Sequence, residues 1–286
     1  MTFVVAGVGY TGGRVLSRLP PAESFGISRT PGSAGKLSIF AVDLDKAPLQ
    51  LPELADRYNL LYTVAPRSDK RGDPRLSALL DALKPAPLRI VYLSTSGVYG
   101  DCGGALVNES RPTNPATERA QRRLAAERLL HDWSDRHAVE LLILRVAAIY
   151  GPGRLGMDGI RRGKAIIAPA EANPGNRIHV EDLADCCAAA MQGVLAPGIY
   201  NICDGDHRSP SWFATAVARL AGLEPPPQIA AAAAERTFSA TRMSFLSESR
   251  RLDNTKLLQT LGHALRYADA EEGIRASLDA EREARL

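Results

Sequence analysis

A short apolar segment at residues 3–6 breaks into the glycine pattern Gly7-x-Gly9-x-x-Gly12, and apolar side chains then recur at helical spacing. Unbroken apolar residues are typical of a strand buried on both faces, so the pattern predicts a strand, a turn and a helix. Gly7 would allow the tight turn, Gly9 would let backbone N–H groups approach phosphates, and Gly12 would let the helix pack on the strand. The turn, which includes Tyr10 and Thr11, therefore predicts a site for the pyrophosphate of a dinucleotide.

Composition limits the possible domain size and the possible classes of partner. The chain has 286 residues, 45% of them hydrophobic, which is enough for a sizeable core in one α/β domain or a domain with a smaller appendage. The formal net charge is only +3, with 35 basic and 32 acidic residues mixed along the chain, so we expect no nucleic-acid and no membrane partner.

The cysteines show no metal-binding or redox spacing; they are Cys102, Cys186, Cys187 and Cys203. We expect reduced thiols, as in a cytoplasmic protein, and no metal. The first strand is expected to begin at Thr2, which leaves no room for a cleavable leader, and no run of about 18 apolar residues occurs. These features predict a soluble cytoplasmic protein.

Apolar runs alternate with helical patterns along the first half of the chain. The expected strands are 25–28, 38–42, 59–64, 88–94 and 139–146, and the expected helices are 74–83 and 116–133. This alternation predicts an α/β fold of the Rossmann type, a doubly wound parallel sheet with right-handed crossovers.

The composition shifts after residue 150. We expect residues 1–150 to form the dinucleotide-binding domain and 151–286 a smaller C-terminal substrate or lid region, with segments near 176–205 returning to the first domain. The later segments are a helix at 180–192, a strand at 198–203, a helix at 209–221, a low-complexity connector at 225–234 and a charged helix at 271–285.

The end of the second expected strand bears on cofactor choice. Where an acidic side chain would bind the ribose hydroxyls of NAD, the chain has Ser28, Arg29 and Thr30. A guanidinium can hold phosphate oxygens in a bidentate fork, so the sequence predicts NADP in preference to NAD. The alternative is an exposed arginine on an ordinary turn. Asp43, Ala65 and Pro66 follow the next two strands, where adenine and ribose contacts are usual.

Four further segments follow one another in a recognisable order. They read VYLSTSGVYGD at 91–101, LRVAAIYGPGR at 144–154, IHVEDLA at 178–184 and IYNIC at 199–203. They resemble the successive signatures of extended short-chain dehydrogenase/reductases, the NAD-dependent epimerase/dehydratase family, and RLDNTK at 251–256 extends the resemblance to its atypical YeeZ-type subgroup. The resemblance implies a pyridine dinucleotide cofactor and oxidoreductase or epimerase (isomerase) chemistry on a small carbonyl or sugar-type substrate.

One departure from the family concerns proton transfer. Family members that carry out redox chemistry use a Tyr-x-x-x-Lys pair on the helix after the fifth strand, and the resemblance places Arg119 and Arg123 there. Arginine stays protonated at any working pH, so neither residue can act as a general base. Two interpretations stay open: the guanidinium groups hold the cofactor ribose or an anionic substrate group, or they lie on a solvated face with an Arg123–Glu127 ion pair contributing about 0.3–0.5 kcal/mol.

The resemblance also marks hydroxyl groups. Thr95 matches the family's catalytic Ser/Thr, four residues before Tyr99, which is the nearest candidate phenol for an acid or base. Tyr99 and Tyr150 are at positions that usually pack around the site. A threonine hydroxyl can bond a substrate oxygen but cannot supply a base at pH 7.

A second departure concerns the substrate. Gly175 stands where sugar-nucleotide enzymes of the family commonly carry an arginine for the diphosphate, and Arg177 lies two residues further on. His179 is expected to be structural, and Asp182 to cap or begin the next helix. A nucleotide-sugar substrate is therefore not favoured.

Three functions remain open. The chain could be an NADP-dependent oxidoreductase or epimerase that uses Thr95 with an unusual acid or base, a catalytically silent NADP-binding sensor or regulator, or an enzyme of different chemistry on a Rossmann scaffold. The expected partner is a small-molecule substrate, and a homodimer also stays open.

Overall fold

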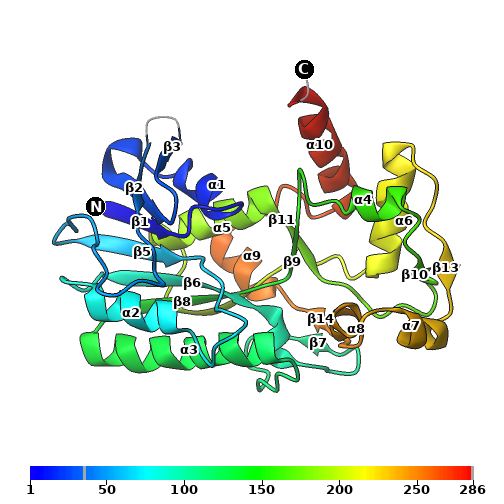
Figure 1. Ribbon diagram of the computed structural model, residues 1–286, viewed down its shortest axis with the longest axis horizontal. Coiled ribbons are helices and arrows are strands. Elements are labelled where there is room, and N and C mark those ends of the chain that lie inside the picture. Colours follow the sequence, from blue (N-terminus) through cyan, green and yellow to red (C-terminus); the bar gives the residue numbers. More distant parts are fainter. Residues whose placement is uncertain (35–36, 285–286) are drawn as a thin grey trace. The chain divides into compact units, whose positions relative to one another are not determined.

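The computed structural model describes residues 1–34 and 37–284, which form two compact units that interleave along the chain. The first unit consists of residues 1–98, 115–145 and 183–200, and the second of 99–114, 146–182 and 201–286. Figure 1 shows the ribbon coloured along the sequence.

The first unit is built on a sheet whose strands run in the order β12-β8-β6-β5-β1-β2-β4-β3. Seven of these strands are parallel, and β3 pairs antiparallel with β4 at one edge. The strands are β1 (Thr2–Ala6), β2 (Ser24–Ser28), β3 (Gly32–Ala34), β4 (Leu37–Ala41), β5 (Tyr58–Tyr62), β6 (Arg89–Thr95), β8 (Glu140–Val146) and β12 (Gly198–Ile202). The predicted doubly wound parallel sheet is confirmed; the short edge strand β3 was not foreseen.

Helices cover both faces of this sheet (Figure 1). α2 (Pro74–Ala82) and α3 (Glu118–His137) lie on one face, and α1 (Gly12–Leu16) and α5 (Val180–Met191) lie on the other. The α2 and α3 helices bury Leu76, Leu79, Leu130 and Trp133 against the strands. Because both faces are covered, β1, β5 and β6 are apolar without alternation, which is the pattern that predicted them.

Polar side chains begin both helices of that face. The Asp73 carboxylate accepts from the Leu76 N–H at 3.2 Å ahead of Pro74, and the Thr117 hydroxyl oxygen accepts from the Ala120 N–H at 3.4 Å. Such N-caps satisfy backbone donors that the first helical turn leaves free. They fix where α2 and α3 start, and therefore which residues stand at the sheet's carboxyl edge.

The second unit contains short parallel strand pairs and helices. Its pairs are β9 (Ala148–Tyr150) with β11 (Arg177–His179), β10 (Ile166–Ile167) with β13 (Gln228–Ile229), and β7 (Leu106–Val107) with β14 (Arg251–Leu252). Its helices are α4 (Met157–Arg161), α6 (Pro210–Ala221), α7 (Ala231–Thr237), α8 (Ala240–Leu246), α9 (Thr255–Leu261) and α10 (Ala270–Glu283). Tyr150, Ile160, Val217 and Ile274 belong to its apolar core.

The predicted helices of this unit are confirmed within a few residues, although Arg285 of the terminal helix lies outside the described residues. The expected connector at 225–234 is wrong in part. Its alanines begin α7, since alanine has the highest helix propensity, while β13 follows its prolines. In the described part of the chain, no helix is both long and apolar enough to cross a membrane. All four cysteines are free thiols, as expected.

Candidate functional site

The turn between β1 and α1 requires glycine for two different reasons. Gly7 has φ +99°, and a Cβ there would lie 2.5 Å from the Thr63 hydroxyl oxygen. A Cβ on Gly12 would collide with the carbonyl oxygen of Gly7. A Cβ on Gly9 would meet none of the described atoms within 4 Å. Gly7 and Gly12 are thus required by the fold, whereas Gly9 leaves open space in front of the turn.

Hydrogen bonds hold this turn in place. The Thr63 hydroxyl at the end of β5 donates to the Gly7 carbonyl at 2.7 Å, and the Gly9 N–H donates to the same carbonyl at 2.9 Å. The Arg14 guanidinium donates to the Tyr10 carbonyl at 2.8 Å and lies 4.3 Å from the centre of its ring. Thr11 is buried at the start of α1. The turn therefore has a fixed shape before any ligand arrives.

The end of β2 leaves a cation exposed. Ser28 is half-buried, and Arg29 and Thr30 are exposed. The Arg29 side chain makes no hydrogen bond or ion pair with any residue that the structure describes. Among the described residues, no contact therefore holds this guanidinium, which leaves it available to bind a ligand.

The segments after β4 and β5 are tied together by arginine. Arg75 donates to the Asp45 carboxylate at 2.5 and 2.8 Å and to the Ala65 carbonyl at 3.4 Å, and Arg67 donates to Asp45 at 3.0 Å. These bonds hold the pKa of Asp45 well below its usual range. Asp43 is half-buried and forms an ion pair with Lys46 at 3.8 Å.

These contacts order the segment after β4, which contains Asp43, and the segment after β5, which contains Ala65 and the half-buried Pro66. Both segments follow the carboxyl ends of strands, as predicted for the adenine and ribose side of the site.

The Arg123 guanidinium is engaged at the carboxyl ends of β5 and β6. It donates to the Leu93 carbonyl at 2.8 Å, to the Tyr92 hydroxyl at 3.2 Å and to the Val64 carbonyl at 3.5 Å. The Arg123–Glu127 ion pair considered from the sequence is wrong. Glu127 lies on the buried face of α3 and pairs with Arg145 of β8 at 2.9 Å, because that strand carries the cation that faces it.

Tyr92 is the phenol bonded to Arg123, but it cannot replace the family's catalytic tyrosine. The ring is fully buried, and burial raises the pKa of Tyr92 to about 12 even though Arg123 acts in the opposite direction. The hydroxyl therefore stays protonated near neutral pH. Arg119, one turn earlier on α3, is half-buried.

Thr95 and Tyr99 differ in their surroundings. Thr95 ends β6 half-buried, and its hydroxyl oxygen accepts from the Gly97 N–H at 3.2 Å. Tyr99 is 1% exposed and donates to the side-chain oxygen of Asn201 at 2.8 Å. Asn201 in turn donates to the carbonyls of Val107 and Asp253. Tyr99 thus supports the interior of the second unit, and its acid–base role stays a prediction.

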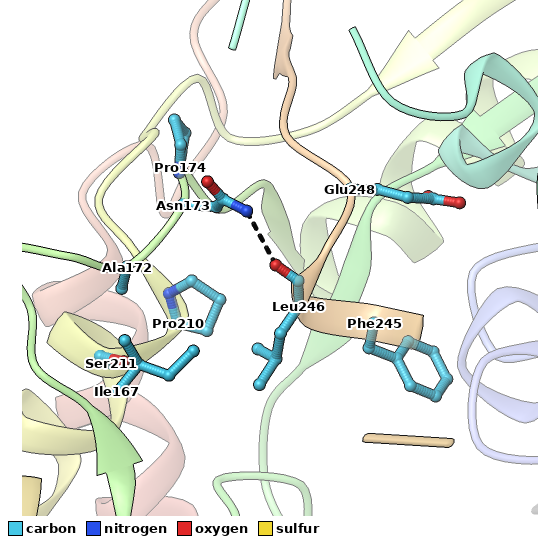
Figure 2. A pocket seen from close by; sticks show the side chains of 9 residues that line it. All are labelled: Ile167, Ala172, Asn173, Pro174, Pro210, Ser211, Phe245, Leu246 and Glu248. Atoms are coloured by element: carbon cyan, nitrogen blue, oxygen red, sulfur yellow. Dashed lines mark hydrogen bonds between the residues drawn. The ribbon is translucent and has the colours of Figure 1, made fainter. Parts of the chain in front are cut away.

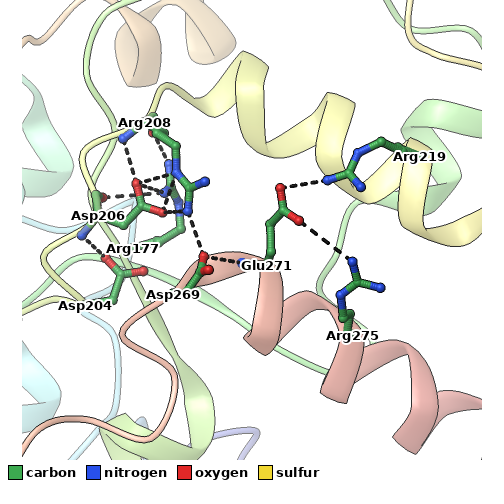
Figure 3. Close-up of polar contacts among 8 residues, drawn as sticks. All are labelled: Arg177, Asp204, Asp206, Arg208, Arg219, Asp269, Glu271 and Arg275. Atoms are coloured by element: carbon green, nitrogen blue, oxygen red, sulfur yellow. Dashed lines mark hydrogen bonds and ion pairs between the residues drawn. The ribbon is translucent and has the colours of Figure 1, made fainter.

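Arg177 in the second unit is committed to internal contacts (Figure 3). It is 4% exposed, pairs with Asp206 at 3.2 Å and donates to the Arg208 carbonyl. A Cβ on Gly175 would lie 2.8 Å from that same carbonyl and 2.9 Å from the Arg177 guanidinium. A larger side chain at 175 therefore does not fit this arrangement, and Arg177 does not take its place as a free cation.

Other polar residues of the second unit make internal contacts. The His179 ring lies 3.1 Å from the Ser277 hydroxyl, and Asp182 in the first turn of α5 accepts from the backbone of Arg266 and Tyr267. Asp204 is unusual because its Oδ2 is buried with no hydrogen-bond partner in the part of the chain that the structure describes. Burial raises the pKa of Asp204 to about 8.

A small pocket of about 20 Å³, lined by both apolar and polar residues, also lies in this unit (Figure 2). It is lined by Ile167, Ala172, Asn173, Pro174, Pro210, Ser211, Phe245, Leu246 and Glu248. Asn173 donates to the Leu246 carbonyl at 2.9 Å and closes one wall. Among the described residues, no group of three or more His, Cys, Asp or Glu side chains could hold a metal ion.

Comparison with known proteins agrees with the fold. Residues 76–203 match the model of the NAD dependent epimerase/dehydratase family. A conserved protein of unknown function from Silicibacter pomeroyi is 35% identical, with a TM-score of 0.80 over 98% of this chain and 99% of its own. Over residues 76–203 the chain is thus similar to the NAD-dependent epimerase/dehydratase family.

Two further relatives set the limits of the comparison. Protein YeeZ of Escherichia coli K12 is 34% identical over 182 residues, which cover 62% of this chain and 64% of YeeZ. The match thus spans less than two thirds of that relative. UDP-glucose 4-epimerase of Thermus thermophilus, solved with NAD, shares the fold at a TM-score of 0.74 and 21% identity, covering 99% and 100% of the two chains.

Sequence reasoning missed the buried polar residues Ser94, Glu127 and Arg145. The Ser94 hydroxyl donates to Glu127, and Arg145 contacts both oxygens of that carboxylate. A signal was present, since Arg145 is a charged residue within the otherwise apolar segment 141–146, and a buried charge requires a partner.

Proposed function

We propose that this chain binds NADP, in preference to NAD, at the turn between β1 and α1, and that it acts on a small carbonyl or sugar-type substrate beside Thr95 as an oxidoreductase or epimerase. The observation that carries the proposal is the contrast among the glycines: Gly7 and Gly12 are required by packing, while Gly9 faces open space. Backbone at the start of a helix with no side chain in front of it suits a pyrophosphate.

The remaining residues fit the same cofactor. The turn at 7–12 would hold the pyrophosphate, the segments at Asp43 and at Ala65–Pro66 would border the adenosine, and Arg119 would face the ribose or an anionic substrate group. When bound, the nicotinamide supplies a centre that accepts or gives a hydride. The Thr95 hydroxyl would orient a substrate oxygen by hydrogen bonding.

The preference for NADP rests on Arg29. An exposed guanidinium with no described partner can form a bidentate contact with a 2′-phosphate. The neighbouring residues, Ser28 and Thr30, carry hydroxyl groups and no carboxylate that would repel the phosphate. The Arg29 contact would be absent for NAD.

Calorimetric titration tests this preference. We expect NADPH to bind at least about tenfold more tightly than NADH, and Arg29→Ala to remove the difference. Arg57→Ala is the matched control, because Arg57 is exposed in the same unit but precedes β5, at the amino edge of the sheet. Equal affinities for the two cofactors in the unmodified protein would refute the assignment.

A second function, a catalytically silent NADP sensor or regulator, is favoured by the state of the phenols. Tyr92 and Tyr99 are buried and hydrogen-bonded, so neither is placed as an exposed base. NADPH oxidation with a panel of carbonyl compounds separates the two functions. Turnover that falls in Thr95→Ala identifies an enzyme, whereas tight NADPH binding without turnover across the panel identifies the sensor.

A further inference from the structure

A buried polar cluster joins three elements of the first unit directly behind Thr95. Glu127 of α3 receives the Ser94 hydroxyl of β6, and Arg145 of β8 donates to its two oxygens at 2.9 and 3.3 Å. The Glu127 and Arg145 side chains are 3% and 5% exposed, and Ser94 is also buried. The cluster therefore lies inside the protein and does not itself face a ligand.

Such a cluster is a poor means of gaining stability. Moving two charges out of water costs several kcal/mol per ion, and well-packed apolar residues of the same volume are often as stable as a buried ion pair. The distinctive property of a buried charged network is direction, since each hydrogen bond fixes an angle as well as a distance. The cluster is therefore suited to fixing the positions of the elements that it joins.

What the cluster places is the carboxyl end of β6 and the start of α3. Ser94 immediately precedes Thr95, and Glu127 stands one helical turn after Arg123 and two after Arg119. Arg123 adds a second tie from the same helix to the Leu93 carbonyl. The Glu127–Ser94 and Arg123–Leu93 hydrogen bonds thus hold α3 against β6 at two points one helical turn apart.

The first turn of α3 also comes close to Thr95. A Cβ on Gly97 would lie 3.5 Å from the Ala120 Cβ and 3.5 Å from the Thr95 hydroxyl oxygen. Small shifts of α3 would therefore move Arg119 relative to Thr95 directly.

We infer that Glu127 is a positioning residue, which acts through Ser94 and Arg145 to set Thr95 and the first turn of α3 for the nicotinamide half of the cofactor. The inference rests on the proposed function, because it assumes that a dinucleotide binds this unit. It assigns no contact between Glu127 and the cofactor. The adenosine half, at the ends of β2, β4 and β5, does not depend on the cluster.

Ser94→Ala is the sharpest test, since it removes one bond to Glu127 and leaves the Glu127–Arg145 pair intact. Two ligands are titrated calorimetrically: NADPH, and 2′,5′-ADP, which has the adenosine half without nicotinamide. We expect Ser94→Ala to weaken NADPH binding by about tenfold and to leave 2′,5′-ADP within about twofold. The fluorescence of bound NADPH, which reports on the nicotinamide environment, should change as well.

Ser134→Ala is the matched control, because Ser134 is also buried, lies on α3, and has no hydrogen-bond partner for its hydroxyl among the described residues. It should leave both affinities unchanged. If Ser94→Ala binds both ligands like the unmodified protein, or loses both equally, the positioning role is overturned. If the unmodified protein binds neither ligand, the proposed function itself fails, which distinguishes the two failures.

Discussion

The turn after β1 and the start of α3 both border the proposed cofactor site. The turn has the glycine pattern of a dinucleotide site, whereas α3 departs from the Tyr-x-x-x-Lys pattern that the resemblance leads one to expect. At the turn, packing requires glycine at positions 7 and 12, while Gly9 leaves the space that the proposed pyrophosphate would occupy. At α3, the resemblance places Arg119 and Arg123 where the family has its tyrosine and lysine, and Arg123 bonds the carbonyls of Val64 and Leu93. The comparison teaches that the proposed dinucleotide site and the family's proton-transfer pair belong to separate elements, so the two can change independently.

The largest expected effect is on the α3 side. Glu127→Gln removes the negative charge that pairs with the buried Arg145 guanidinium, which should lower the free energy of unfolding by about 3–5 kcal/mol. Urea denaturation measures the loss. Glu118→Gln is the control: Glu118 pairs with Arg122 on the same helix, but its side chain is 83% exposed, so it should cost under about 1 kcal/mol. Similar losses in the two variants would show that burial of Glu127 is irrelevant.

Arg123→Ala comes next. Removing the guanidinium leaves the Leu93 carbonyl without that donor, and an unsatisfied buried acceptor costs about 1–3 kcal/mol. We expect this loss in thermal or urea unfolding, with NADPH affinity changed by less than about threefold. A large loss of NADPH affinity at unchanged stability would instead mean that Arg123 contacts the cofactor, and the contrast between the two regions would break.

The last effect concerns a carboxylate of the second unit, depends on pH, and is small within any single pH unit. The pKa of Asp204 is raised by burial from 3.8 to about 8 in the folded protein. A raised folded-state pKa gives stability that is complete below pH 3.8 and is lost as pH rises through 8. Asp204→Asn should therefore gain stability relative to the unmodified protein between those values, by up to about 1 kcal/mol per pH unit.

Urea unfolding of both proteins at several pH values measures this difference. A difference that stays constant across the range would show that Asp204 is ionised in the folded state. The two buried carboxylates differ in their partners. Glu127 contacts Arg145 and Ser94, whereas Asp204 Oδ2 has no hydrogen-bond partner among the described residues.

The sequence was sufficient for the main sheet and the glycine turn because both depend on local patterns. Apolar runs without alternation marked β1, β5 and β6, and the spacing of glycines marked the turn. The partner of Glu127 could not be found in this way. Arg145 lies 18 residues away on strand β8, and only the packing of α3 on β8 brings it to Glu127. Spacing along the helix had instead suggested the nearer Arg123.

The same limit applies to Tyr99 and Tyr92. Motif position marked Tyr99 as a candidate phenol, but its bond to Asn201 crosses 102 residues and cannot be inferred from spacing. Tyr92 looked like an ordinary strand residue, and its contact with Arg123 depends on how α3 lies over β6. Local patterns predict elements, whereas the contacts that define chemistry arise from tertiary packing.

The central claim, that the turn after β1 binds a dinucleotide, is tested most directly by calorimetric titration of NADPH into the unmodified protein and Gly9→Val. Gly9 lies outside the left-handed φ region and its Cβ would meet no described atom within 4 Å, so the variant should keep its melting temperature. The side chain would instead occupy the space of the pyrophosphate, and we predict a loss of NADPH affinity of about 100-fold or more. NADPH binding of equal affinity in both proteins would contradict the account.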